Sequence, residues 1–215
     1  MADLEKLTEA ILEGNAKAAA AITKEAIEEG ASPVALVQER MVPAMDEAGR
    51  RFECEEYFVP ELLLSARAMK AALELLRPLL AASGAQPAGR VVIGTVKGDL
   101  HDIGKNLVSS LLEGGGFEVV DLGADVSPEK FVEAIRNSGA QIVCLSALLT
   151  VTMPSMKTTI EALKAAGVRD QVKVMVGGAP VTAQFAAEIG ADGYGENASV
   201  AVGLARGFVK KEAAA

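Results

Sequence analysis

The chain has 215 residues, of which 50% are hydrophobic, 23% are charged and 4% are aromatic. This length and composition allow one large or two small globular domains with a core of mostly aliphatic side chains. The formal net charge of −8, without a basic stripe interleaved with aromatics, argues against a nucleic acid partner. The N-terminus lacks the features of a secretory signal and no apolar run reaches membrane-spanning length, so we expect a cytoplasmic protein without membrane contact.

The chain contains two cysteines and a single histidine. Cys54 and Cys144 lie far apart in the sequence, so neither is expected to belong to a spaced zinc or iron–sulfur set. Cys144 lies in the apolar run QIVCLSAL and is expected to be a buried, small hydrophobic residue.

Apolar residues between positions 3 and 82 recur at the spacing of an α-helix and predict a four-helix bundle. Asn15 and Ser32 are expected N-caps, and Pro33 suits the first position of a helix. Pro43 lies inside the third helix and should kink it. The four helices are expected over residues 4–14, 15–30, 32–48 and 59–80.

The segment AASGAQPAGR (81–90) interrupts this period with Gly, Pro and small residues, which is typical of a linker. After it, short β-branched apolar runs alternate with helical segments, and five such units predict a flavodoxin-like (Rossmann-like) α/β domain with a parallel sheet. The strands are expected over 91–96, 117–123, 141–148, 172–179 and 192–196, and the helices over 105–114, 128–138, 154–166, 182–189 and 198–209. The predicted organisation is a helical bundle cap over 1–82, a linker over 83–89, and the α/β domain over 90–211.

The only histidine, His101, lies in VKGDLHDIGKN (96–106), the loop that leaves the first predicted strand. In a sheet of this kind, ligands bind beyond the carboxyl ends of the strands, although a solvated loop histidine is the ordinary alternative. A phosphate loop requires four residues between its glycines and a Ser or Thr after its lysine, whereas here the spacing is five and Lys105 is followed by asparagine. A dinucleotide fingerprint, a serine-nucleophile elbow and the several histidines of a phosphohydrolase are also missing from the sequence.

A metal that is already held by a macrocycle needs only one protein atom on its axis, which a single histidine can supply. A carboxylate beside such a ligand fixes the other imidazole nitrogen as a hydrogen-bond donor. Asp99, two residues before His101, can make this bond. The loop therefore indicates an axial histidine for a metal in a macrocycle.

The sequence contains three separated motifs: D-x-H-x-x-G at 99–104, S-x-L at 146–148 and G-G at 177–178, with 41 and 28 residues between them. They fall at the predicted ends of the first, third and fourth strands. This pattern resembles the signature of cobalamin-binding domains of the base-off, histidine-on group. The resemblance covers nearly the whole chain and extends to the cobalamin-binding module of methionine synthase and to the small corrinoid proteins of methanogens and acetogens.

The resemblance implies cobalamin, or a related corrinoid, as cofactor, with His101 as the protein ligand of cobalt. Asp99 and Thr152 would complete a triad that exchanges protons as the cobalt changes its oxidation state; methionine synthase has serine at the position of Thr152. Ser146 would offer its hydroxyl to the benzimidazole of the nucleotide tail. Further cofactor-binding residues implied by the resemblance are Gly104, Gly177, Gly178, Asp102, Ile103, Leu148 and Thr150.

The helical half resembles the cap that covers the upper face of the corrin in methionine synthase. Phe52 and Val59 match the two apolar residues above the methyl group there, the second of which is leucine in that enzyme. Ordinary packing in the bundle is the alternative for both residues. A lid would shield a light-sensitive and easily oxidised cofactor, and the linker 83–89 would let it swing away for a partner.

The resemblance implies a methyl-carrying corrinoid protein of a cobalamin-dependent methyltransferase system, with no substrate or acceptor domain of its own. The expected partners are a substrate:corrinoid methyltransferase, an acceptor-side methyltransferase that serves a folate or thiol coenzyme, and a reductive activating protein. Two alternatives are the cobalamin-binding subunit of an adenosylcobalamin-dependent mutase, which the preceding bundle argues against, and a cobalamin sensor. A sensor of transcription would need a DNA-binding segment with basic residues, and residues 1–82 offer none.

Overall fold

The structure is a computed structural model that describes residues 3–84 and 86–212. It divides into two compact units. The helical unit comprises Met1–Pro87 and Glu113–Gly116, and the sheet unit comprises Ala88–Leu112 and Phe117–Ala215. Residues 86–89 of the predicted linker form neither helix nor strand. Residue 85 of the predicted linker and residues 1 and 2 of the predicted first domain lie outside the described residues.

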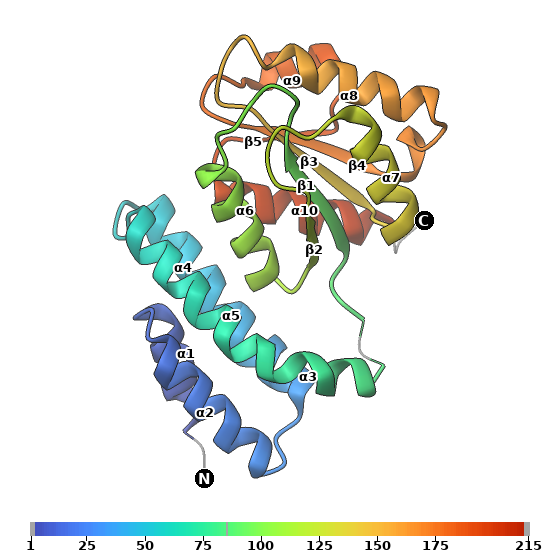
Figure 1. Ribbon diagram of the computed structural model, residues 1–215. Coiled ribbons are helices and arrows are strands. Elements are labelled where there is room, and N and C mark those ends of the chain that lie inside the picture. Colours follow the sequence, from blue (N-terminus) through green and yellow to red (C-terminus); the bar gives the residue numbers. More distant parts are fainter. Residues whose placement is uncertain (1–2, 85, 213–215) are drawn as a thin grey trace. The chain divides into compact units, whose positions relative to one another are not determined.

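The helical unit contains α-helices that follow one another along the chain (Figure 1). They are α1 (Leu4–Leu12), α2 (Ala16–Glu28), α3 (Pro33–Leu36), the π-helical turn η1 (Val37–Met41), α4 (Val42–Glu53) and α5 (Val59–Ala82). The predicted N-caps are confirmed: the side chain of Asn15 accepts the N–H of Ala18 at 3.1 Å, and that of Ser32 accepts the N–H of Ala35 at 3.4 Å. Each cap satisfies a backbone donor that the first helical turn leaves free.

The third predicted helix differs from its prediction, because it is three consecutive pieces that run on to Glu53 instead of ending near residue 48. Pro43 has no N–H, and its ring would clash with the carbonyl of Glu39 in a regular helix. At this point the helix forms a wider, π-helical turn, in which the N–H of Val42 donates to the carbonyl of Val37 five residues back. Beyond the expected end, Glu47 accepts from Arg50 and Arg51 at 2.8 Å each, which supports the last turns of α4.

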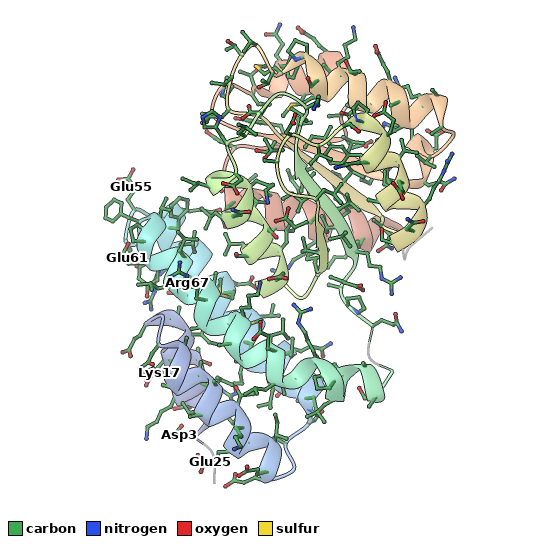
Figure 2. The ribbon with its side chains drawn as sticks, viewed as in Figure 1. Asp3, Lys17, Glu25, Glu55, Glu61 and Arg67 are labelled. Carbon is green, nitrogen blue, oxygen red and sulfur yellow. The ribbon has the colours of Figure 1, made fainter. Side chains whose placement is uncertain are left out.

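The helical unit has an apolar interior and a charged exterior. Figure 2 shows Asp3, Lys17, Glu25, Glu55, Glu61 and Arg67 directed away from the helices, and all are exposed. The large side chains that are fully buried in this unit are Leu7, Ile11, Leu36, Met41, Leu62, Met69 and Leu76. This separation of faces stabilises the bundle, because packing of the apolar faces contributes most of the stability of helices as short as α1.

The sheet unit is a five-stranded parallel sheet with helices between its strands, as predicted (Figure 1). The strands are β1 (Arg90–Thr95), β2 (Glu118–Asp121), β3 (Ile142–Ser146), β4 (Lys173–Gly177) and β5 (Gly193–Gly195), in the order β2-β1-β3-β4-β5. The helices are α6 (Ile103–Gly114), α7 (Pro128–Ser138), α8 (Pro154–Ala165), α9 (Ala183–Ile189) and α10 (Ala198–Glu212), with a 3-10 turn η2 (Arg169–Gln171). This strand order is that of flavodoxin-like proteins.

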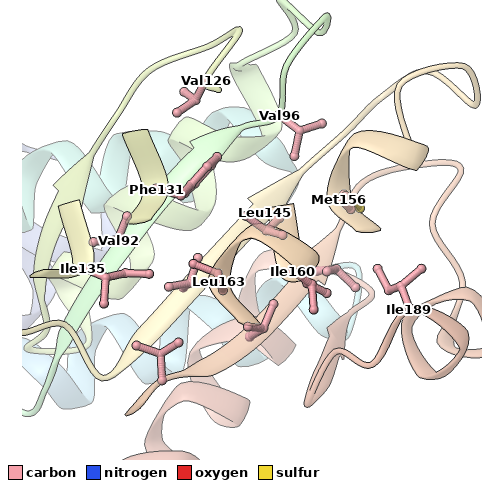
Figure 3. Packing of buried hydrophobic residues seen from close by; sticks show 14 of the residues in the cluster. Val92, Val96, Val126, Phe131, Ile135, Leu145, Met156, Ile160, Leu163 and Ile189 are labelled. Carbon is pink, nitrogen blue, oxygen red and sulfur yellow. The ribbon is translucent and has the colours of Figure 1, made fainter. Parts of the chain in front are cut away.

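The core of the sheet unit lies against the central strands, which are buried almost throughout. Phe131 and Ile135 from α7 and Ile160 and Leu163 from α8 pack on one face of the sheet with Leu145 (Figure 3). β-branched residues dominate β1, where all positions after Arg90 are buried. A core of this size holds the strand ends rigidly, which is what a site built on their loops requires.

The strand register aligns motif residues at the carboxyl edge of the sheet. Thr95 pairs with Ser146, Ser146 pairs with Gly177, and Gly177 pairs with Gly195. The loops that carry the predicted site leave the sheet immediately beyond this row. Among the helices of the described residues, none combines the length and apolar character that crossing a bilayer requires.

Candidate functional site

Asp99 lies at the centre of the site, in the loop that follows β1, and is fully buried. Its Oδ1 accepts the backbone N–H of His101 at 3.0 Å and the imidazole Nδ1 of His101 at 2.8 Å. An aspartate that bonds to the backbone two residues on closes a tight local turn. One carboxylate oxygen thus fixes both the main chain and the ring of the same histidine.

The other carboxylate oxygen of Asp99 is held by the turn that follows β3. Oδ2 accepts the backbone N–H groups of Leu148 at 2.8 Å and Leu149 at 3.2 Å. The hydroxyl of Thr152, which is also buried, donates to the same oxygen at 2.7 Å. Two loops that are about fifty residues apart in the sequence are joined through this one carboxylate.

Electrostatics keep this carboxylate ionised. Burial alone would raise the pKa of Asp99, but hydrogen bonds from the Thr152 hydroxyl and from the backbone N–H groups of His101 and Leu148 outweigh it and hold the pKa well below its ordinary value. A carboxylate can only accept, so Nδ1 of His101 carries a proton. In the neutral imidazole the lone pair then lies on Nε2.

Nε2 is the free end of this arrangement. The His101 side chain is 50% exposed, and within the described residues Nε2 has no hydrogen-bond partner. Large apolar side chains stand exposed on the same two loops and at the start of α6, which is unusual for a surface facing only water. They are Leu100, Ile103, Leu148, Leu149 and Val151.

The three motif glycines serve different purposes. At Gly178, with φ of +133°, a Cβ would come within 1.9 Å of the Ala147 carbonyl oxygen, so the fold itself excludes a side chain there. At Gly177 a Cβ would lie 2.9 Å from the Gly195 carbonyl oxygen, again too close. At Gly104 a Cβ would meet nothing within 4 Å. The protein's own packing therefore explains Gly177 and Gly178 but leaves Gly104 unexplained.

The remaining residues implied by the resemblance lie as follows. Asp102 precedes α6 and its carbonyl accepts the N–H of Asn106 at 2.7 Å, and Thr150 is exposed in the turn after β3. Phe52 and Val59 belong to the helical unit, at the end of α4 and the start of α5; the first is half-buried and the second is 39% exposed. Their place above a cofactor stays a prediction.

The phosphate-loop alternative is excluded by the position of Lys105. This side chain is almost completely buried, and its Nζ donates to the carboxylate of Asp121 and the side-chain oxygen of Asn106. In residues 3–84 and 86–212, no group of three or more His, Cys, Asp or Glu side chains could hold a metal ion. A metal at His101 would therefore need its other ligands from a source other than these side chains.

Two residues that hold the histidine loop were missed in the sequence. Thr95, the last residue of β1, is buried and donates its hydroxyl to the carbonyl oxygen of His101 at 3.0 Å. Asp125, in the loop after β2, accepts the N–H of Gly98 at 2.8 Å. The segment LGADVS (122–127), which follows β2 at the carboxyl edge of the sheet, indicated where Asp125 lies but not what it contacts.

Fold and site together define a flavodoxin-like α/β domain that offers one oriented imidazole at the carboxyl edge of its sheet. The B12 binding domain family matches residues 89–203, and a second B12 binding domain family matches residues 3–77. The chain therefore belongs to the family of B12-binding proteins.

Relatives that match over nearly the whole of both chains support this assignment. The chain is 44% identical to trimethylamine corrinoid protein 2 of Methanosarcina mazei, with 95% of each chain covered, and 40% identical to a corrinoid protein of Desulfitobacterium hafniense, with 98% and 99% covered. Among solved structures, it is similar to a cobalamin-binding protein from Desulfitobacterium hafniense (33% identity, TM-score 0.77, 97% and 99% covered). It is also similar to a chain of the methanol:cobalamin methyltransferase complex of Methanosarcina barkeri (31% identity, TM-score 0.85, 96% and 79% covered).

Proposed function

We propose that this protein is a corrinoid carrier that binds cobalamin with the benzimidazole base off and His101 on the cobalt. In this role it shuttles a methyl group between a substrate:corrinoid methyltransferase and a second methyltransferase. The names of its relatives, which include trimethylamine and dimethylamine corrinoid proteins, support a methylamine or a similar one-carbon compound as methyl donor.

The observation that carries the proposal is the hydrogen bond of 2.8 Å between Asp99 Oδ1 and His101 Nδ1. This bond leaves the lone pair on Nε2 of a side chain that is half exposed and lies among apolar side chains. A single nitrogen donor of this kind would fit a metal that brings its other ligands with it. When bound, the corrinoid supplies a cobalt atom that accepts a methyl group from one partner and gives it up to another.

The chain's own contribution is to hold a proton in a fixed place. The proton on Nδ1 is shared with Asp99, and the hydroxyl of Thr152 has a single proton for two acceptors, Asp99 Oδ2 at 2.7 Å and the Leu149 carbonyl at 2.8 Å. Donation to the charged acceptor is the stronger bond. Asp99 therefore stays an anion that increases the basicity of Nε2.

The nucleotide tail would lie along the carboxyl edge of the sheet. Ser146 and Gly177 are register partners there, and Gly178 follows directly. The absence of side chains at both glycines would let the tail approach the backbone, and Gly104 would leave room beside the histidine loop. The hydroxyl of Ser146 would offer a hydrogen bond to the displaced base.

The relatives favour a methyl carrier over the subunit of a mutase, because the match to a B12 binding domain includes the helical residues 3–77 and the similar corrinoid proteins share this length. The required partners are then a methyltransferase specific for the donor and one that serves a folate or thiol coenzyme. A reductive activating protein would restore cobalt that has become oxidised.

The ligation is tested by adding cobalamin to the cofactor-free protein and recording its absorption spectrum. We expect a base-off spectrum whose axial nitrogen belongs to the protein, as shown by a change of the cobalt(II) EPR splitting from triplet to doublet when the histidine is labelled with ¹⁵N. His101→Ala should lose this signal, whereas Thr152→Ser should keep it. A spectrum with the benzimidazole still on the metal would overturn the proposal.

The carrier role is tested with partners encoded near the gene. Labelled methyl groups from trimethylamine, dimethylamine or methanol should appear on the protein-bound corrinoid only when a methyltransferase is added, and should leave it when an acceptor-side enzyme is added. Use of an adenosyl group instead, with rearrangement of a carbon skeleton, would support the mutase alternative.

A further inference from the structure

We infer that Thr95 and Asp125 are positioning residues that set the imidazole of His101 from outside the triad with Asp99 and Thr152. They act through the histidine loop, residues 96–102, which connects β1 to α6. The consequence for cofactor binding rests on the proposed function, whereas the effect on the imidazole itself does not.

The sheet order places a holding loop on each side of the histidine loop. β1 lies between β2 and β3, so the loops that follow those two strands flank the one that carries His101. On the β3 side, Leu148, Leu149 and Thr152 hold the carboxylate of Asp99. The β2 side holds the main chain instead.

Asp125 makes this second set of contacts with both its backbone and its side chain. Its N–H donates to the carbonyl oxygen of Asp99 at 2.9 Å, and its Oδ1 accepts the N–H of Gly98 at 2.8 Å. Its Oδ2 accepts from Nζ of Lys97 at 3.0 Å. The residues on either side of Gly98 are thus both bound to the same aspartate.

The backbone conformations of Gly98 and Asp125 explain why the histidine loop needs these contacts. Gly98 has φ of +87° and Asp125 has φ of +54°, so the chain reverses through the left-handed region at both points. Among residues with a side chain, aspartate and asparagine tolerate this region best. A residue other than glycine in this region persists only where surrounding contacts hold it there.

Thr95 holds the other end of the loop. It is fully buried, and its hydroxyl donates to the carbonyl oxygen of His101 at 3.0 Å. This contact fixes the peptide unit that follows the histidine, while Asp99 fixes the N–H that precedes its Cα. The backbone of His101 is therefore held on both sides. This fixes the position of the Cα from which the ring extends to Asp99.

The chain offers a matched control at a remote place. Asp192, before β5, also accepts a backbone N–H and a basic side chain: Val174 N–H at 2.7 Å and Arg169 Nη2 at 2.8 Å. It lies at the amino-terminal edge of the sheet, away from the histidine loop. Asp192→Ala should reduce stability without an effect on the imidazole, and by less than Asp125→Ala, because the alanine at 125 must also adopt φ of +54°.

The first measurement uses cofactor-free protein at one fixed pH. Because the sequence contains a single histidine, ¹⁵N labelling of histidine gives one pair of ring nitrogen signals once any affinity tag is removed. We expect the Nδ1–H tautomer to dominate in the unmodified protein. Thr95→Val should lower the ratio of the two tautomers about fivefold, the factor that corresponds to one lost neutral hydrogen bond. Asp125→Ala should lower it at least as much, because its lost hydrogen bond is to a carboxylate. Thr95→Ser, Asp125→Asn and Asp192→Ala should leave the ratio unchanged.

The second measurement adds cobalamin and compares the fraction of histidine-ligated cofactor at equal concentrations. Thr95→Val and Asp125→Ala should reduce this fraction by a similar factor, and Lys97→Met should not, because the bond to Gly98 remains. Unchanged tautomer ratios in Thr95→Val and Asp125→Ala, with stability lowered as in Asp192→Ala, would overturn the inference. If Asp125→Ala does not fold, the isosteric Thr95→Val is sufficient for the test. If the unmodified protein does not bind cobalamin, the proposed function is refuted, but the first measurement still decides this inference.

Discussion

The hydroxyl of Thr152 and the carboxylate of Asp99 meet at 2.7 Å, although their residues lie on loops that leave different strands. This contact joins the turn after β3 to the loop after β1, and both groups are buried. A hydrogen bond to a buried carboxylate is stronger than one between neutral groups. Its loss should therefore be measurable in the stability of the cofactor-free protein.

Replacing Thr152 tests this link directly. Thr152→Val preserves the shape of the side chain but removes the donor, and we expect the free energy of unfolding to fall by about 2 kcal/mol. Thr152→Ser keeps the hydroxyl and should cost less than about 1 kcal/mol. Urea unfolding followed by circular dichroism measures both values, and equal losses in the two variants would show that the hydroxyl does not bind Asp99.

The lowered pKa of Asp99 predicts how stability depends on pH. Because the folded state holds this pKa below that of the unfolded chain, ionised Asp99 stabilises the fold above about pH 4, and this stabilisation is lost progressively as the pH falls below that value. Asp99→Asn removes the titrating group and leaves an amide facing several donors. At pH 7 it should reduce the free energy of unfolding by about 3 kcal/mol.

The difference in stability between the unmodified protein and Asp99→Asn should shrink between about pH 4 and pH 2, since protonation removes the advantage of the carboxylate. Denaturant unfolding at several pH values in that range measures it. A difference that stays constant with pH would mean that the carboxylate is not ionised in the folded protein.

The cysteines should differ in reactivity, because burial raises the pKa of the Cys144 thiol to about 12, whereas Cys54 is exposed. The thiolate is the reactive form, so a thiol reagent at pH 8 should label Cys54 and leave Cys144 unmodified in the folded protein. Mass spectrometry of labelled peptides distinguishes the two sites, and denatured protein provides the control in which both react. Rapid labelling of Cys144 under native conditions would mean that β3 opens readily.

Most of the architecture could be predicted because the strands and most of the helices have local sequence signals. The apolar runs of β1, β3 and β4 and the periodic helices between them led to the strand order that the structure contains. The π-turn η1 was not predictable from Pro43 alone, because a proline inside a helix is compatible with a kink, a break or a wider turn.

The candidate site was predictable only where its residues lie close in sequence or in a spaced motif. Asp99 and His101 are two residues apart, and their hydrogen bond followed from that spacing. The contributions of Leu149 and Asp125 could not be inferred in the same way, because a backbone N–H carries no side-chain signal and the positive φ of Asp125 depends on the loop it contacts. Tertiary structure, not local sequence, brings these groups to Asp99.

Gly104 and Gly178 both belong to the motif, but their surroundings differ, so their replacement by alanine should have opposite effects on stability. Gly178→Ala places a Cβ 1.9 Å from the Ala147 carbonyl oxygen and forces a side chain into φ of +133°, so we expect loss of the folded protein. Gly104→Ala meets nothing within 4 Å and replaces a helical glycine by alanine, so stability should rise by up to about 1 kcal/mol. If Gly104 is kept for the cofactor, the same variant should bind cobalamin more weakly, as measured by titration of its absorption spectrum. Tight binding by Gly104→Ala would show that the cofactor does not need this glycine.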